Sequence, residues 1–264
     1  MSNANAAAGS VRPPVTLMAH LVAGYPTTAL ALAAARGLAQ GGISCFEVQF
    51  PFSDPSADGT AIQTACSAVL SRGYRVEEGF EFVAELRRAY PAIPVYVMTY
   101  ANLAYKAGIG EFVSRTALAG AAGLIIPDLP FDHDEGLSAA CALYGLAAVP
   151  VAAPSMTAER LAALGSLGRP YVYAALRSGI TGSTTLIDEG TLSFIRSVAG
   201  KSGSRILGGF GIRNGAQSAE LSGHVYAVVA GSVFVDLIRA HAGQGGEAVR
   251  GAVEAKAREL TGIA

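Results

Sequence analysis

Hydrophobic residues along this chain come in short runs that alternate with longer segments of helical spacing. The first run, 17–22, ends at a Gly-Tyr-Pro turn, after which Thr27 or Thr28 can cap an Ala- and Leu-rich helix. Further strands are predicted at 44–49, 95–99, 124–126, 147–151, 171–175, 205–207 and 226–230. Further helices are predicted at 60–70, 76–90, 110–119, 134–144, 158–167, 192–199 and 216–221, from 232 onward, and at 247–260.

Continuous hydrophobic strands that alternate with helices are typical of a parallel sheet buried on both faces. Eight strand–helix units in about 250 residues indicate that the sheet closes into a (β/α)8 barrel. A doubly wound open sheet is the alternative, but its usual Gly-x-Gly-x-x-Gly after the first strand is missing. We expect a flexible N-terminal segment over 1–15, and we see no composition break that would define a second domain after it.

Composition limits the partners and the cellular compartment expected for this fold. Hydrophobic residues make up 51% of the 264 residues and charged residues 15%, which suffices for a large core. The net charge is −1 without a basic block, so there is no electrostatic case for nucleic acid or an anionic membrane. No hydrophobic run approaches the roughly 20 residues that cross a bilayer, and we expect no signal peptide. The three cysteines fit reduced thiols in a cytoplasm, and no Cys/His cluster has metal-ligand spacing.

A carboxyl group stands inside the second predicted strand. Alternation places Glu47 on the same face as Cys45 and Gln49, while Phe46 and Val48 face the helices, so Glu47 should point into the barrel. A buried carboxylate is costly unless it is paired or functional. Two interpretations remain open: a general acid–base residue, or a structural carboxylate bonded to a neighbouring strand.

A second carboxyl group, Asp58, lies in the long loop after this strand, which is rich in Pro, Asp and Ser. Asp58 precedes Gly59 and a helix, so one interpretation is that it is simply the N-cap of that helix. Two carboxylates above one barrel mouth would instead divide the work of an acid–base reaction. The chemistry of a barrel sits at the carboxyl ends of its strands, where both residues are predicted.

Three glycine-rich turns, 178–183, 208–212 and 231–232, follow the last three predicted strands. Glycine allows backbone N–H groups to approach an anion closely, and a helix start adds aligned donors. One such turn can simply end a strand, but three in consecutive units predict a phosphate site that needs no Lys or Arg. The predicted fold is therefore a single α/β domain over 16–264, a (β/α)8 TIM barrel of the phosphate-binding type.

Seven segments occur in an order and spacing shared with a known family. Residues 47–59 read Glu-Val-Gln-Phe-Pro-Phe-Ser-Asp-Pro-Ser-Ala-Asp-Gly, a highly specific motif. The other six are Gly24-Tyr25-Pro26, Thr99-Tyr100-Ala101-Asn102, Pro127-Asp128-Leu129-Pro130, Gly179-Ile180-Thr181-Gly182, Gly209-Phe210-Gly211-Ile212 and Gly231-Ser232. From about residue 17 to 240 the chain thus resembles tryptophan synthase α chains, which implies a lyase that splits indole-3-glycerol phosphate into indole and glyceraldehyde 3-phosphate.

The resemblance implies roles for matching residues. Glu47 matches the general acid–base residue, and Asp58 matches the carboxylate that binds the indole N–H. Tyr173 matches a tyrosine beside this pair, and Thr181 matches the threonine of a loop that closes onto Asp58. The phosphate-binding turns are matched by Gly182, Phe210, Gly211, Gly231 and Ser232, and the indole pocket would be lined by Met98, Tyr100, Ile125 and Val151, each of which could equally be plain core.

The resemblance also implies partners. The chain would need no metal and no cofactor, and would act with a tryptophan synthase β subunit in an α2β2 assembly, where the β partner holds pyridoxal phosphate. The loops around 54–55 and 128–130 resemble the partner-facing surface. Two alternatives stay open: a sugar-phosphate isomerase or epimerase, which would leave the Asp58 loop unexplained, and a barrel kept only to activate the β partner.

Three features depart from the family pattern. Gln49 replaces the usual glycine beside the catalytic strand end, and should narrow the site or add a hydrogen bond. His20 stands where a hydrophobic residue often contacts the substrate, and a core or rim histidine is weighed there against a catalytic one. The family's N-terminal helix, which covers the barrel bottom, has no clear counterpart before Leu17, so we predict a different seal.

Overall fold

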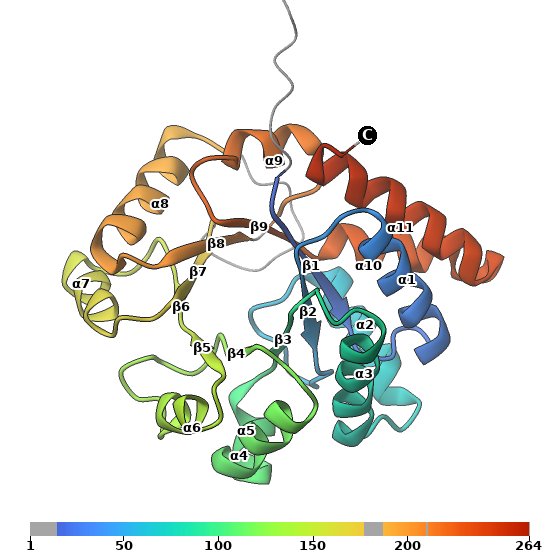
Figure 1. The fold of residues 1–264 in the computed structure, drawn as a ribbon, viewed down its shortest axis with the longest axis horizontal. Coiled ribbons are helices and arrows are strands. Elements are labelled where there is room, and N and C mark those ends of the chain that lie inside the picture. The colour runs from blue at the N-terminus through green and yellow to red at the C-terminus, as the bar shows by residue number, and fades with distance from the viewer. Residues whose placement is uncertain (1–14, 177–186, 210, 264) are drawn as a thin grey trace, which may run out of the picture.

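The computed structural model describes residues 15–176, 187–209 and 211–263, which form one parallel sheet surrounded by helices (Figure 1). The N-terminal segment predicted over 1–15 lies almost wholly outside the described residues. The strands are β1 (Leu17–Val22), β2 (Cys45–Gln49), β3 (Val95–Met98), β4 (Gly123–Ile125), β5 (Ala147–Val149), β6 (Val151–Ala152), β7 (Tyr171–Ala175), β8 (Arg205–Gly209) and β9 (Ala227–Ala230).

Helices follow the strands in chain order and form the outer ring in Figure 1. They are α1 (Thr28–Gln40), α2 (Thr60–Ser71), α3 (Val76–Ala89), α4 (Ala101–Ala107), α5 (Ile109–Leu118), α6 (Leu137–Leu143), α7 (Ala158–Ser166), α8 (Glu189–Ser202), α9 (Gly215–Leu221), α10 (Ser232–His241), the 3-10 helix η1 (Ala242–Gln244) and α11 (Gly246–Thr261). In the described residues, no helix has the length and hydrophobicity that a membrane crossing requires.

Proline explains why the sheet has nine strands where eight were predicted. The strands run in the order β5-β4-β3-β2-β1-β9-β8-β7-β6, and β5 and β6 are consecutive in the chain on either side of Pro150. Pro150 has no N–H to donate to a ladder, so the strand is interrupted there. β5 pairs with β4, β6 pairs with β7, and the N–H of Tyr173 donates to the carbonyl of Pro150 (2.9 Å). One interrupted strand thus closes an eight-unit barrel, as predicted.

Side chains of successive strand residues divide between two hydrophobic layers. In β2, Cys45 belongs to the cluster inside the barrel, while Phe46 and Val48 belong to the cluster between strands and helices. The predicted facing of this strand is confirmed, and it sends Glu47 and Gln49 inward, where both are buried. Strand alternation is therefore what delivers polar groups to the barrel interior.

Most predicted elements are present within a few residues of their expected bounds. Thr27 caps α1, with its hydroxyl accepting from the N–H of Leu30 (3.3 Å). The short helix α4 was not predicted; its first N–H, at Ala101, donates to the Asp128 carboxylate (2.9 Å). A side chain from the next βα loop thus helps to begin this helix, a tertiary contact that local spacing does not reveal.

Aromatic rings fill the end of the barrel opposite the carboxyl ends of the strands. Tyr171 begins β7 and Tyr226 immediately precedes β9, and their ring centroids lie 5.7 Å apart. Tyr96 meets Tyr171 edge-on at 6.0 Å, and the guanidinium of Arg205 lies 4.9 Å from the Tyr226 ring centroid. These side chains pack together at the barrel bottom, while the segment before Leu17 that the predicted departure concerns lies largely outside the described residues.

A second aromatic cluster supports the strand that carries Glu47. Phe50 follows β2 and is fully buried, with its ring 5.1 Å from Phe80 and 6.1 Å from Phe112. Phe80 and Phe112 are 5.5 Å apart, so α3 and α5 are packed together behind the strand. This packing fixes the position of the carboxyl end of β2.

We predict that Phe112→Ala lowers the free energy of unfolding by about 3–5 kcal/mol, because it opens a cavity in this buried cluster. Leu118→Ala on the same helix is the matched control, since that side chain is 84% exposed, and it should change the free energy by under about 0.5 kcal/mol. Urea unfolding measures both. Equal effects of the two substitutions would contradict the assignment of this cluster as core.

Candidate active site

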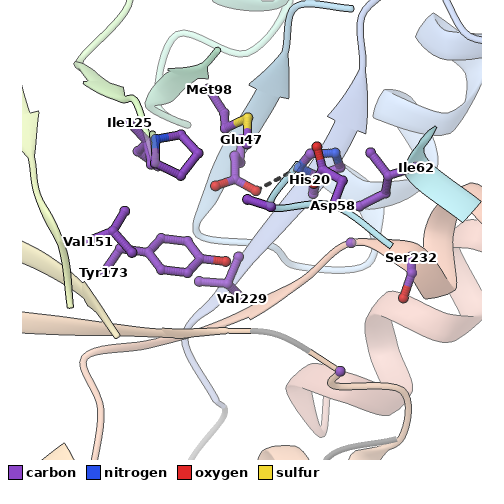
Figure 2. A pocket seen from close by; sticks show the side chains of 14 residues that line it. His20, Glu47, Asp58, Ile62, Met98, Ile125, Val151, Tyr173, Val229 and Ser232 are labelled. Carbon is purple, nitrogen blue, oxygen red and sulfur yellow. Dashed lines mark hydrogen bonds and ion pairs between the residues drawn. The ribbon is translucent and has the colours of Figure 1, made fainter. Parts of the chain in front are cut away.

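A cavity of the described residues opens at the carboxyl ends of the strands (Figure 2). The cavity volume is about 50 Å³. Its walls combine two carboxyl groups, an imidazole and a phenol with a set of hydrophobic side chains and two glycines. The lining residues are His20, Glu47, Ala57, Asp58, Ile62, Met98, Ile125, Pro127, Val151, Tyr173, Gly211, Val229, Gly231 and Ser232.

Glu47 points into this cavity from β2 and is paired with a histidine of the neighbouring strand. His20 Nδ1 lies 2.7 Å from Glu47 Oε2, and both residues are nearly fully buried. The two residues are register partners in β1 and β2. Glu47 therefore makes the predicted bond to a neighbouring strand and also faces the cavity.

Asp58 reaches the same cavity from the loop after β2. Its Oδ2 accepts hydrogen bonds from Gln49 Nε2 (2.7 Å) and from the Tyr100 hydroxyl (2.8 Å), and its residue is 3% exposed. Gln49 thus adds a hydrogen bond, one of the two effects predicted for it. Both bonds hold the carboxyl group in one orientation at the barrel mouth.

Local contacts of the loop also fix Asp58. Its N–H donates to the Pro55 carbonyl (3.0 Å), and its carbonyl accepts from Gln63 Nε2 (2.8 Å). The N-cap of α2 is Gly59, without a side-chain cap bond. The interpretation of Asp58 as a helix cap was therefore wrong, because its carboxyl group turns into the barrel instead.

Burial dominates the ionisation of the groups around the cavity. Burial raises the pKa of Asp58 above its ordinary value, and although the His20 charge and the hydrogen bonds from Tyr100 and Gln49 lower it, the net direction is upward. For His20, burial lowers the pKa, but the hydrogen bond and charge of Glu47 and the charge of Asp58 raise it, with a net rise.

Other protonatable groups near the site stay neutral. Burial, with the charges of Glu47 and Asp58, holds the pKa of Tyr173 well above its usual range. Burial raises the pKa of the Cys45 thiol to about 12, with Glu47 adding to the rise. These two groups are therefore not expected to exchange protons at neutral pH.

Hydrophobic side chains form the wall between the carboxyl groups and the far strands. Met98, Ile125 and Val151, three of the four residues expected around an indole ring, line the cavity, and Figure 2 shows them on the Glu47 and Tyr173 side. The fourth, Tyr100, is fully buried behind Asp58 and is not among the lining residues. Its contact in the structure is with the Asp58 carboxyl group.

Backbone amides frame the opposite rim. Gly211 has φ +83°, a conformation that favours glycine, and Gly231 is the N-cap of α10 without a side-chain cap bond. Ser232 begins that helix and is buried beside the cavity. Arg213 Nη1 lies 3.3 Å from Ser232 Oγ, and Arg213 Nη2 donates to Asp236 (2.8 Å). The Arg213 guanidinium thus lies near the predicted phosphate site, for which the sequence analysis expected no Lys or Arg.

Sequence reasoning and structure agree on only part of this site. One cavity brings together six of the predicted site residues: Glu47, Asp58, Tyr173, Gly211, Gly231 and Ser232. Three others lie outside the described residues: Thr181, Gly182 and Phe210. The support that Gln49 gives Asp58 and the bond of His20 to Glu47 were not predicted in detail. The signal was available, since both residues are polar and alternate onto the inward face of hydrophobic strands.

No group of three or more His, Cys, Asp and Glu residues in the described part of the chain is arranged to hold a metal ion. The three cysteines are free and buried.

The fold and the cavity define a (β/α)8-barrel enzyme with paired carboxyl groups at the mouth. The family model of the tryptophan synthase alpha chain matches residues 11–263. The chain belongs to the tryptophan synthase α chain family. Members of this family are lyases that cleave indole-3-glycerol phosphate, and membership removes the isomerase and epimerase alternative.

Individual relatives agree with this assignment. The tryptophan synthase alpha chain of Helicobacter hepaticus is 37% identical over 234 residues, covering 87% of this chain and 88% of the relative. That of Methanosarcina acetivorans is 35% identical over 245 residues, covering 92% and 86%. A solved structure of Mycobacterium tuberculosis tryptophan synthase superposes with a TM-score of 0.84 at 32% identity, covering 94% of this chain and 92% of that one.

A further solved structure shows the fold within an assembly. A chain of the tryptophan synthase α2β2 complex from Pyrococcus furiosus superposes with a TM-score of 0.82 at 28% identity, covering 95% of this chain and 99% of that chain. The architecture is thus shared with a relative that works as part of a larger complex.

The raised pKa of Asp58 predicts how stability depends on pH. The folded chain binds this proton more tightly than the unfolded chain, so ionisation of Asp58 reduces stability as pH rises above the ordinary value of 3.8. Asp58→Asn removes this cost, and its oxygen can still accept from Gln49 and Tyr100. We expect the variant to be more stable than the native chain at pH 7.5, with a smaller difference at pH 4.5, as measured by urea unfolding.

Asp54→Asn is the matched control, because this carboxyl group lies in the same loop but is exposed. It should show no comparable pH-dependent gain. If Asp58→Asn instead lowers stability at pH 7.5, then Asp58 is stabilised by its ionised contacts and the stated direction of its pKa shift is wrong.

Proposed function

We propose that this chain cleaves indole-3-glycerol phosphate into indole and glyceraldehyde 3-phosphate with Glu47 as the general acid–base residue and Asp58 as the partner of the indole nitrogen. The observation that carries the assignment is the burial of both carboxyl groups in one partly hydrophobic cavity. A buried carboxylate costs free energy, so two in one cavity are best explained by chemistry.

Glu47 moves the protons of the reaction. It donates a proton to indole C3, and this addition weakens the bond between C3 and the glycerol side chain. It then accepts the proton of the 3′-hydroxyl as the C3–C3′ bond breaks, the oxygen forms the aldehyde of glyceraldehyde 3-phosphate, and the bonding electrons return to the ring. One proton enters and one leaves, so Glu47 ends in its starting state.

Asp58 stabilises the charge that develops on the ring. Protonation at C3 places positive charge on the indole nitrogen, and a carboxylate that accepts the N–H offsets it. Gln49 and Tyr100 both donate to Oδ2 and so hold the group before the substrate arrives. Positioning the carboxylate in advance removes a cost of reorganisation at the transition state. This is the role we assign to Tyr100, in place of direct substrate contact.

The phosphate is placed at the rim formed by Gly211, Gly231 and Ser232. Backbone N–H groups at the start of α10 are unsatisfied within the helix and carry its positive dipole end. The family resemblance assigns Gly182 and Phe210 to the same rim. It also assigns Thr181 a contact with Asp58. Tyr173, which is neutral, lies beside Glu47 and is assigned to the substrate wall.

The proposed reaction needs no cofactor of its own, since protonation at carbon and deprotonation of an alcohol are within reach of carboxyl groups. We further propose that the chain acts in a cytoplasmic α2β2 assembly, as in the Pyrococcus furiosus relative, with pyridoxal phosphate held by the β subunit. The exposed residues Asp54, Asp128 and Pro130 are assigned to the surface that meets this partner.

Glu47→Gln tests the proposal directly. The amide keeps the size and hydrogen bonding of the side chain but cannot shuttle a proton, so we expect indole release from indole-3-glycerol phosphate to fall by about 1000-fold or more. Binding to a tryptophan synthase β subunit should be kept. Indole release is followed with and without the β subunit, and binding by the mobility of the complex on gel filtration.

Glu111→Gln serves as the control, because this exposed carboxyl group lies on α5, away from the cavity. It should leave indole release unchanged. Full cleavage by the Glu47→Gln variant would refute the acid–base role. Absence of cleavage by the native chain under all conditions, together with stimulation of the β reaction, would instead favour a barrel that only activates its partner.

A further inference from the structure

His20 is the one ionisable residue of the cavity to which the proposed reaction gives no task. This residue is 3% exposed, lies within β1 and lines the cavity. Figure 2 shows it next to Asp58, with its bond to Glu47 drawn as a dashed line. An ionisable ring at this place requires an explanation beyond the filling of space.

Two features set His20 apart from a satisfied core histidine. Its Nε2 is buried and has no hydrogen-bond partner among the described residues, which is costly for a polar atom. Its ring also sits against the backbone at Gly231, where an added Cβ would lie 3.1 Å from His20 Cβ and 3.3 Å from Cγ. The glycine leaves room for the imidazole at the edge of the cavity. Packing alone would be met more cheaply by a hydrophobic side chain.

The bond to Glu47 constrains the carboxyl group at one oxygen only. His20 Nδ1 lies 2.7 Å from Oε2, and Figure 2 shows the other oxygen on the side of Ile125 and Tyr173. A carboxyl group that rotates freely presents its proton in many directions. Fixing Oε2 aims the remaining oxygen at the hydrophobic part of the cavity, where the reacting carbon is expected.

We propose that His20 is a positioning residue, which orients Glu47 through the Nδ1–Oε2 hydrogen bond and thereby sets the rate of proton transfer to the substrate. This inference rests on the acid–base role of Glu47. The neighbouring strands place the pair in register, so the couple is built into the β1–β2 ladder. It acts on the catalytic step and not on substrate affinity.

The charges around the imidazole are consistent with this couple. Burial, the largest influence, lowers the pKa of His20, but the hydrogen bond and charge of Glu47 and the more distant charge of Asp58 together raise it above its ordinary value. Cys45 and Tyr173, the other titratable groups near Glu47, are kept neutral by burial. A raised pKa favours a proton on the imidazole, so that Nδ1 can donate to Oε2.

The test compares His20→Phe with His20→Asn in the complete chain. Phenylalanine keeps the ring shape without the hydrogen bond, whereas the asparagine amide can donate from near the Nδ1 position. For indole release we expect His20→Phe to lower kcat by about 10- to 100-fold with KM changed by less than about threefold. His20→Asn should recover most of kcat. His224→Asn, at an exposed histidine, is the control and should behave as the native chain.

Nuclear magnetic resonance of the imidazole nitrogens provides a second readout that does not depend on turnover. Glu47→Gln should shift the His20 nitrogen resonances and leave those of the other three histidines in place. An unchanged His20 spectrum, or a native kcat in His20→Phe, would overturn the inference. So would parallel losses in both His20 variants with a matching rise in KM, since that pattern marks a packing or binding role. If Glu47→Gln itself remains active, the proposed function fails first.

Discussion

Burial of two carboxyl groups in one cavity is the constraint on which the rest of this structure depends. Glu47 and Asp58 are each almost fully removed from water, and their carboxyl groups face the same cavity. The chain meets this cost with specific donors: His20 for one carboxyl group, Gln49 and Tyr100 for the other. Such a local cost in stability is expected of carboxyl groups that, as proposed, exchange protons in a dry site.

The barrel makes such an arrangement possible by supplying stiffness from outside the site. The Phe50, Phe80 and Phe112 rings hold β2 from the helix side, and the tyrosines at the bottom close the interior at the far end. Hydrophobic packing therefore fixes the backbone, and the hydrogen bonds need only orient side chains. The two kinds of contact divide the work of placing each carboxyl oxygen.

Two of the expected departures from the family pattern lie next to the buried carboxyl groups. Gln49 and His20, where the sequence was expected to depart from the family, are both polar, and each contacts one of the two carboxyl groups. The two residues lie on adjacent strands, both directed inward. They therefore flank the two carboxyl groups from adjacent strands.

The sequence by itself determined the barrel, the order of its strands and helices, and the inward position of Glu47, because hydrophobic periodicity and strand alternation are local properties of the chain. The motif of residues 47–59 also determined the family, and with it the place of Asp58. Only the tertiary structure decided which donors meet these carboxyl groups, that Tyr100 supports Asp58 instead of lining the cavity, and that Pro150 splits one strand at the point of closure. Those outcomes depend on distances between residues far apart in the chain, such as Asp58 and Tyr100, which are set by how the strands are staggered and how the side chains pack. No local spacing encodes them.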